Sequence, residues 1–373
     1  MKKRIIIAGI GETGLITATR LSHRYDIVGV SPKPCLLSGQ ELGTRLTRPE
    51  QWQKNYLLPF RRYKKLDGVT TLHGKITEIR PETNEVKIQL ANGDTKTETF
   101  DALLISSGVS NGFWRNNTLE NEETISSNLT RYAEQFSIAK TIAIVGGGAT
   151  GVSVSANLAT RYPDKNIHFF YSQERPLPGY HPKVRKNIES QLVARGVQLH
   201  PYHRAHTDNT ALESSLTRET IAWESGQNAF SADLVLWAVG NVKPNSDFVP
   251  EVMLDKQGYV KTDRYLRVPG YNNIFSVGDI AASDPNRSSA RNGGYETVAH
   301  NIDCYLRGTT QAMKTYKPSP YRWGSILGVQ NNGLQVFLPN GSSIRFPLWA
   351  VNTILFPLIV RKGIYGGIRA DKV

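Results

Sequence analysis

The chain has 373 residues, of which 39% are hydrophobic and 21% are charged, and its formal net charge is +13. This length predicts two or three domains, and this composition excludes wholesale disorder. The positive charge favours anionic partners or is a solvated basic surface, but no run of five or more Lys or Arg marks a nucleic-acid-binding tail.

The two cysteines, Cys35 and Cys304, stand far apart and form no CxxC pair, which indicates a reducing compartment. The apolar run after residues 1–4 is too short for a signal peptide, and Lys2 occupies the position where N-myristoylation requires glycine. No stretch of 18 or more apolar residues is present, so we expect a cytoplasmic protein without a transmembrane helix.

The first predicted strand, residues 5–8, runs into glycines at three spaced positions, Gly9, Gly11 and Gly14, and then into a helix-compatible segment. Gly9 suits a tight turn, Gly11 leaves room for a phosphate, and Gly14 allows the helix to pack closely on the strand. Because a helix start offers free N–H groups and a positive dipole end, this pattern predicts a dinucleotide phosphate site.

The segment after this motif predicts further strands. Residues 75–100 alternate polar and apolar side chains around Asn92 and Gly93, which indicates a hairpin. Residues 101–108 then read as a buried strand that ends in Gly108.

The same plan returns in the middle of the chain. A β-branched run over residues 141–145 leads into Gly146, Gly148 and Gly151, and a helix-compatible segment follows. A single motif of this kind is weak, but two of them, each after a strand, predict two nucleotide-binding units.

The second unit continues as the first does. Apolar residues recur every four positions before Gly196 and predict a helix that this glycine ends; they are Val184, Ile188 and Leu192. Residues 211–233 resemble the earlier meander, and residues 233–240 form a second buried strand that ends in glycine.

The chain changes character after Gly240. A short strand ends in Gly278 and Asp279, and this segment is expected to return to the first domain. Residues 315–373 are rich in Gly, Pro and aromatic residues and form a third unit. The predicted fold class is therefore α/β, with two tandem Rossmann-like dinucleotide-binding domains and a small C-terminal domain.

With these motifs, the chain resembles the two-dinucleotide-fold flavoprotein oxidoreductases, the pyridine nucleotide–disulfide oxidoreductase-like family. Within it, the chain is most similar to the ferroptosis-suppressor and apoptosis-inducing-factor-like quinone oxidoreductases, with type II NADH dehydrogenases as relatives. The general resemblance covers residues 5–310, and the closer one rests on short segments: residues 162–165, 172–173, 184–199 and 316–318, followed by Gly328 and Gly333.

The resemblance implies FAD and NAD(P)H as cofactors. It implies an FAD-binding domain formed by residues 1–110 and 246–312, an NAD(P)H-binding domain over residues 111–245, and a C-terminal domain over residues 313–373. The implied FAD-binding residues are Gly9, Gly11, Thr13, Gly14, Ser31, Lys33, Arg48 or Arg45, Ile76 (through its backbone), Gly108, Gly278 and Asp279. The implied NAD(P)-binding residues are Gly146, Gly148, Thr150, Gly151, Ser172, Arg175 and Gly240.

The chain departs from the family pattern at two carboxylate positions. Ser31 ends the second strand, where an acidic residue is expected on the FAD ribose, and Ser153 stands near the nicotinamide, where relatives often carry Glu. The resemblance implies that the flavin carries the chemistry, so no catalytic side chain is assigned; Ser153 is expected near the nicotinamide, and no metal is expected. Ser172 and Arg175 suit the 2′-phosphate of NADPH, whereas Glu174 suits the free ribose of NADH, and the balance favours tolerance of NADPH.

The C-terminal segment has no charge over residues 346–360 and is followed by basic residues: Arg361, Lys362, Arg369 and Lys372. It is too short, and has too many prolines, to span a bilayer. We expect residues 346–373 to lie at the surface of a membrane, on its cytoplasmic face; the other interpretations are packing against the flavin domains or a homodimer interface.

The resemblance and the apolar tail together indicate an NAD(P)H oxidoreductase that reduces a quinone or another small electron acceptor. A reductase of a soluble electron carrier is the second interpretation. A non-catalytic nucleotide sensor or nucleic-acid-binding protein is the third, although nucleic acid is not an expected partner.

Overall fold

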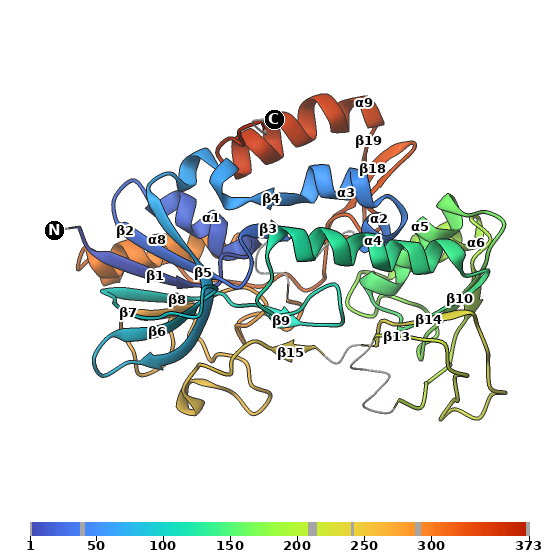
Figure 1. Ribbon diagram of the computed structural model, residues 1–373, viewed down its shortest axis with the longest axis horizontal. Helices are drawn as coiled ribbons and strands as arrows, with labels where there is room; N and C mark the ends of the chain where they lie inside the picture. The colour runs from blue at the N-terminus through green and yellow to red at the C-terminus, as the bar shows by residue number, and fades with distance from the viewer. Residues whose placement is uncertain (1, 38–41, 208–214, 240–241, 288–291, 371–373) are drawn as a thin grey trace.

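The computed structural model describes residues 2–37, 42–207, 215–239, 242–287 and 292–370. Two sheets with parallel cores lie side by side, each covered by helices, and the C-terminal segment lies across one face of the molecule (Figure 1). The predicted α/β fold class is confirmed.

The first sheet has seven strands in the order β16-β8-β1-β2-β5-β6-β7. Its strands are β1 (Arg4–Ala8), β2 (Asp26–Ser31), β5 (Val69–Arg80), β6 (Glu85–Leu90), β7 (Thr95–Thr99), β8 (Ala102–Ile105) and β16 (Ile274–Ser276). Strands β16, β8, β1, β2 and β5 pair in parallel, and β5, β6 and β7 form an antiparallel meander. The turn at Asn92 and Gly93 joins β6 to β7, as the hairpin pattern predicts.

The alternation of side chains along β1 divides the core of this domain. Ile5 and Ile7 pack against helices α1 (Glu12–Leu21) and α8 (Gly294–Leu306), and Ile6 packs on the opposite face with the meander. Both faces of the central strands are thus buried, which explains why β1 reads as a continuous apolar run.

The second sheet has five strands in the order β12-β11-β10-β14-β13. Its strands are β10 (Thr141–Val145), β11 (Asn166–Phe170), β12 (Gln198–His200), β13 (Leu216–Thr217) and β14 (Leu234–Trp237). The helices of this domain are α4 (Glu122–Ile138), α5 (Ala149–Arg161) and α6 (Pro182–Val193). The stripe Val184, Ile188 and Leu192 on α6 is fully buried, and Gly196 follows the helix with a φ of +78°.

The predicted meander over residues 211–233 falls in part outside the described residues. Its described part contains β13, which pairs with β14, and an isolated bridge between Ile221 and Phe230. Two short strands, β9 (Val109–Ser110) and β15 (Lys243–Pro244), pair with each other where the chain passes between the two sheets. The domain limits drawn from the sequence stay a prediction.

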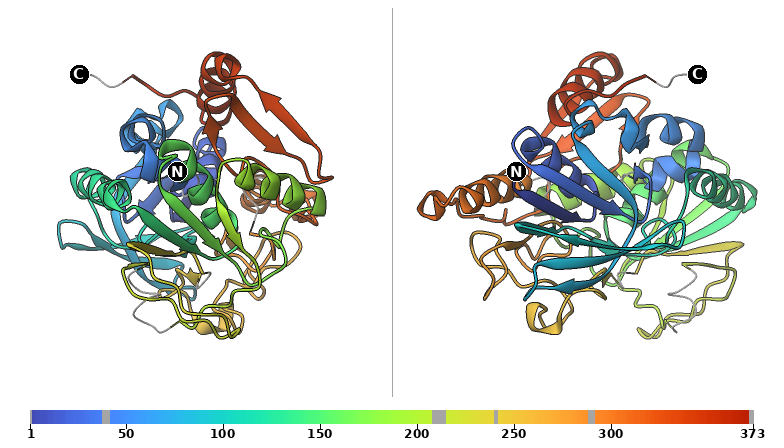
Figure 2. Two further views of the ribbon diagram at one scale, coloured as in Figure 1. Left: turned by 90° about the vertical axis from the view of Figure 1, so that its right-hand side faces the viewer. Right: turned by 60° about the vertical axis from the view of Figure 1, so that its left-hand side comes forward.

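The remaining elements surround the first domain and form the C-terminal unit. They are β3 (Cys35–Leu37), α2 (Leu42–Thr47), α3 (Pro49–Tyr56), β4 (Leu57–Pro59), η1 (Phe60–Arg62), η2 (Lys64–Leu66), η3 (Glu251–Met253), η4 (Thr310–Ala312), β17 (Val329–Gln330), β18 (Gly333–Phe337), β19 (Ser343–Phe346), α9 (Leu348–Ala350) and the π-helical η5 (Val351–Ile364). Figure 2 shows α9 and η5 as one continuous helical rod beside the small β18–β19 hairpin.

The C-terminal rod is fastened to the first domain by aromatic contacts. The ring of Phe356 lies 5.9 Å from that of Tyr56 on α3, and the ring of Tyr365 lies 5.5 Å from that of Tyr63. Within the described residues, none of the helices combines the length and the apolar character needed to cross a membrane.

Candidate functional site

A cleft of about 750 Å³ lies between the two sheets, and both glycine-rich turns line it. The first turn follows β1 and the second follows β10, so residues at the carboxyl ends of the two central strands line the same space. Crevices at the carboxyl ends of parallel strands are where open α/β sheets bind ligands.

The first turn has the geometry that a dinucleotide phosphate requires. A side chain at Gly9 would place its Cβ 2.6 Å from the Ser106 carbonyl oxygen, and one at Gly14 would place it 2.1 Å from the Gly9 carbonyl oxygen. At Gly11, by contrast, a Cβ atom would meet nothing within 4 Å. Gly9 and Gly14 therefore permit close packing, while Gly11 faces the cleft at the start of α1, which has no side-chain cap.

The second turn repeats this geometry residue for residue. A Cβ atom would lie 2.3 Å from the Ala238 carbonyl oxygen at Gly146 and 2.2 Å from the Gly146 carbonyl oxygen at Gly151. Gly148 again has open space before it, at the uncapped start of α5. Both turns can thus admit a pyrophosphate to the N–H groups of a helix start, and the residues present fit two dinucleotides.

The structure brings most of the implied FAD-binding residues together on the cleft wall. Those that line it are Gly9, Gly11, Thr13, Ser31, Lys33, Ile76, Gly108, Gly278 and Asp279. Gly14 lies behind the turn, where it packs α1 on β1. Arg48 does not line the cleft, because its guanidinium points to the Oδ1 atom of Asn157, 3.3 Å away, and to the carbonyl of Val329.

Arg45, the alternative to Arg48, lines the cleft. Its Nη1 atom donates to the Trp114 carbonyl oxygen at 3.1 Å, and its guanidinium lies 4.9 Å from the ring centre of Trp52. Its Nε atom is buried and has no hydrogen-bond partner in the part of the chain that the structure describes. Burial lowers the pKa of Arg45 to about 10, so the side chain remains a cation at neutral pH.

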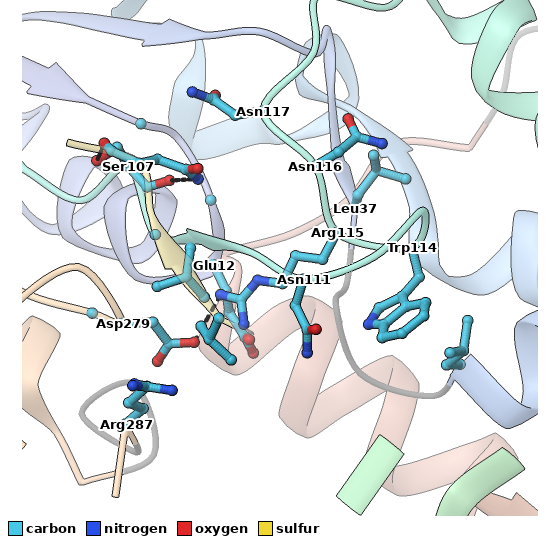
Figure 3. Close-up of a pocket in the computed structure, with 18 of the residues that line it drawn as sticks. Glu12, Leu37, Ser107, Asn111, Trp114, Arg115, Asn116, Asn117, Asp279 and Arg287 are labelled. Atoms are coloured by element: carbon cyan, nitrogen blue, oxygen red, sulfur yellow. Dashed lines mark hydrogen bonds and ion pairs between the residues drawn. The ribbon is translucent and has the colours of Figure 1, made fainter. Parts of the chain in front are cut away.

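Asp279 lies three residues after the end of β16, near two arginines that the sequence pattern did not single out. Arg115 donates to the Asp279 carboxylate at 2.7 Å, and Arg287 reaches the same part of the cleft (Figure 3). Arg115 follows β8 and β9, so the rule that ligands bind beyond the carboxyl ends of strands could have indicated this segment.

On the side of the second domain, four implied NAD(P)-binding residues line the cleft: Gly146, Gly148, Thr150 and Ser172. Gly151 does not line the cleft, because it packs against the backbone of Gly146. Ser153, the residue expected near the nicotinamide, also lines the cleft. Arg175 does not, since its Nε atom lies 3.0 Å from the Glu189 carboxylate on α6. Gly240 lies outside the described residues. The Ser153 hydroxyl is buried with no hydrogen-bond partner among the described residues, at the point where α5 meets Gly43 of α2.

Neither cysteine can act as half of a dithiol within this structure. Cys35 lines the cleft and Cys304 lies on α8, and both are buried free thiols. Burial raises the pKa of the Cys35 thiol to about 12, so it is not a thiolate at neutral pH. His200 does not line the cleft, and burial with neighbouring histidines lowers its pKa to about 4.

The fold and this cleft define a protein with two dinucleotide-binding sites. The sequence profile of the pyridine nucleotide-disulphide oxidoreductase family matches residues 3–303, and the chain belongs to that family. FAD and NAD(P)H are accordingly its cofactors.

Known relatives agree with the resemblance drawn from the sequence. The chain is 25% identical to apoptosis-inducing factor homolog B of Dictyostelium discoideum, over 90% of each chain. It is 26% identical to ferroptosis suppressor protein 1 of Xenopus tropicalis, over 90% of this chain and 88% of that one, and 26% identical to demethylphylloquinone reductase NdbB of Synechocystis, over 93% of each. The sulfide:quinone oxidoreductase of Aquifex aeolicus shares the fold at 17% identity, with a TM-score of 0.69 over 99% of this chain and 93% of that one.

Proposed function

We propose that the protein is an FAD-dependent NAD(P)H:quinone oxidoreductase. The observation that carries this proposal is that both glycine-rich turns open on one cleft, so that the reactive rings of two dinucleotides can meet. The chemistry that the bound cofactors supply is hydride transfer from the nicotinamide to the flavin and electron transfer onward to the acceptor.

In this proposal, the residues of the chain bind the two cofactors and orient them. The start of α1 with Gly11 would hold the FAD pyrophosphate, and Asp279 the ribityl chain. The start of α5 with Gly148 would hold NAD(P)H. Arg45, a buried cation on the cleft wall, would stabilise negative charge on a reduced flavin, because a charge interaction is stronger where water is excluded.

Two observations favour a quinone as the acceptor: the names of related proteins, and the apolar surface of the C-terminal rod. The names of two relatives describe reductases or oxidoreductases of quinones. A second, smaller cavity of about 100 Å³ lies between α3 and the C-terminal rod, lined by Tyr56, Phe356 and Pro357 among others. The rod itself exposes large apolar side chains: Trp349, Ile354, Leu358, Ile359 and Ile364. We infer that this face touches a membrane surface, where a lipid-soluble acceptor is available.

The proposed function is tested by the visible spectrum of the purified protein under argon. We expect flavin absorption bands that bleach on addition of NADH or NADPH and return on addition of a soluble quinone. Bleaching without reoxidation by a quinone would overturn the proposal that a quinone is the acceptor, but the protein would still be an FAD-dependent enzyme that oxidises NAD(P)H. A protein that takes up no FAD would overturn the whole proposal.

A reductase of a soluble electron carrier is the second candidate, and the net charge of +13 favours it because a basic surface attracts acidic proteins. It predicts that reoxidation by an acidic carrier such as a ferredoxin slows steeply with added salt. Reoxidation by a quinone is not expected to depend on salt in that way.

A further inference from the structure

The end of β2 contributes a serine to the cleft where the doubly wound fold ordinarily has a carboxylate. Ser31 is the last residue of β2, and its neighbour Val30 accepts a hydrogen bond from the backbone of Gly9, so this strand end adjoins the first glycine turn. In this fold class, a carboxylate at this position binds the ribose hydroxyls of the nucleotide. A serine hydroxyl cannot supply that charge.

A second segment of the chain docks on this strand end. The backbone N–H of Glu120 donates to the Pro32 carbonyl oxygen at 3.1 Å. The Nε2 atom of His73, which is paired in register with Ser31, lies 3.2 Å from the Pro32 carbonyl oxygen and 3.1 Å from that of Glu120. Residue 120 is therefore held beside the end of β2 by its backbone, independently of its side chain.

The Glu120 carboxylate is held in place within the cleft wall. It forms an ion pair with Lys33, and the two side chains are only 16% and 9% exposed. The Lys33 ammonium also donates to the Asn116 side chain and to the Thr118 carbonyl oxygen, and Asn128 donates to the other Glu120 oxygen at 3.3 Å.

This arrangement leaves acceptor capacity on the carboxylate. A carboxylate has about four lone-pair sites, of which Lys33 and Asn128 occupy two. Glu120, Lys33, Ser31 and Ile76 all line the cleft, so the carboxylate shares a wall with the residue implied to meet the adenine.

We propose that Glu120 replaces the missing carboxylate of β2 and accepts the hydrogen bonds of the adenosine ribose of FAD, with Lys33 as its positioning residue. The proposal rests on the proposed function only in that FAD binds the first glycine turn. The proposal also explains why an ion pair is buried here. Burying two charges costs desolvation free energy, and an ion pair that only held the loop in place would gain little to offset that cost.

The test compares FAD with its analogue that lacks the adenosine 2′-hydroxyl, titrated into the apoprotein and followed by flavin fluorescence. We expect the wild type to bind FAD roughly tenfold more tightly than the analogue, the size of one hydrogen bond to a charged group. Glu120→Gln should bind FAD roughly tenfold more weakly and should no longer distinguish the two ligands. Glu122→Gln is the matched control, because Glu122 pairs with Arg61 and does not line the cleft.

A rescue variant separates ligand binding from a structural role. Ser31→Glu added to Glu120→Gln returns a carboxylate to the end of β2, and we expect it to restore both FAD affinity and discrimination. A structural role would instead weaken FAD and the analogue equally and keep their ratio, which would overturn the proposal. If Glu120→Gln fails to fold, the wild type alone still tests the proposal: equal affinities for FAD and the analogue would overturn it. A wild type that binds no FAD at all would overturn the proposed function instead.

Discussion

At the scale of single residues, the glycines of the two turns differ in what a side chain would meet. We expect Gly11→Ala to fold normally but to bind FAD at least tenfold more weakly, because its Cβ enters the space before the start of α1. Gly148→Ala should weaken the binding of NAD(P)H in the same way and leave the affinity for FAD unchanged. Titration of each variant with both cofactors measures this.

Gly14→Ala is the matched control for the first turn. Its Cβ would lie 2.1 Å from a backbone oxygen, so we expect a loss of about 1–3 kcal/mol in the free energy of unfolding by urea. A Gly11→Ala variant that loses stability but keeps its FAD affinity would contradict the assignment.

We predict that Arg175 sets the preference between NADPH and NADH, and that its ion pair with Glu189 holds the guanidinium away from the nucleotide. The Glu189 carboxylate lies 3.0 Å from the Nε atom of Arg175, on the loop that follows β11. Glu189→Gln should free the guanidinium and raise the affinity for NADPH relative to NADH about fivefold, while Arg175→Gln should lower that ratio. Stability should change by less than about 1 kcal/mol, because both side chains are only partly buried and ion pairs near the surface contribute little. Equal ratios in all three proteins would show that Arg175 does not meet the 2′-phosphate.

At the scale of elements, the C-terminal rod presents apolar side chains that the fold does not cover. Trp349 is 65% exposed and Leu358 is 53% exposed, whereas Val351 is fully buried. We expect the double variant Trp349→Ser and Leu358→Ser to lose more than tenfold in binding to vesicles containing anionic lipid, because each large apolar side chain contributes roughly 2 kcal/mol when buried. Sedimentation with vesicles measures this.

The control for the rod is activity with a water-soluble quinone, which the double variant should retain. Val351→Ser should instead reduce stability, since that side chain belongs to the interior. The result could instead be that the wild type is a dimer that does not bind vesicles and the double variant is a monomer. That outcome would show that this face is a homodimer interface.

At the scale of the whole molecule, the cleft joins groups from both domains, so the cofactor should stabilise the folded chain. FAD at a hundredfold excess over its dissociation constant adds about 2.7 kcal/mol to the free energy of unfolding. We expect the thermal midpoint to rise by several degrees, and by less in Gly11→Ala at the same FAD concentration. A midpoint that FAD leaves unchanged would mean that the cofactor does not bind the native state.

Several features of this molecule could be predicted because their causes are local in the chain. The turns at Gly9 and Gly146 need a positive φ, which few other residues adopt, so a glycine after a predicted strand indicates such a turn from the sequence alone. The apolar runs of β1 and β10 follow from burial on both faces, and the stripe on α6 follows from the helical period. The α/β class and the two dinucleotide-binding turns could therefore be predicted from these patterns, whereas the identity of the two cofactors came from the family resemblance.

Tertiary packing alone decided which charged side chains reach the cleft. Arg45 lies on α2 and Arg48 stands three residues later, between α2 and α3; the two are equally plausible in sequence, yet only Arg45 lines the cleft. Glu120 stands far along the chain from the β2 strand end that it adjoins, and no periodicity links them. A sequence determines by itself what backbone each short segment can adopt. The meeting of distant side chains depends on how the segments pack, and therefore only the folded structure shows it.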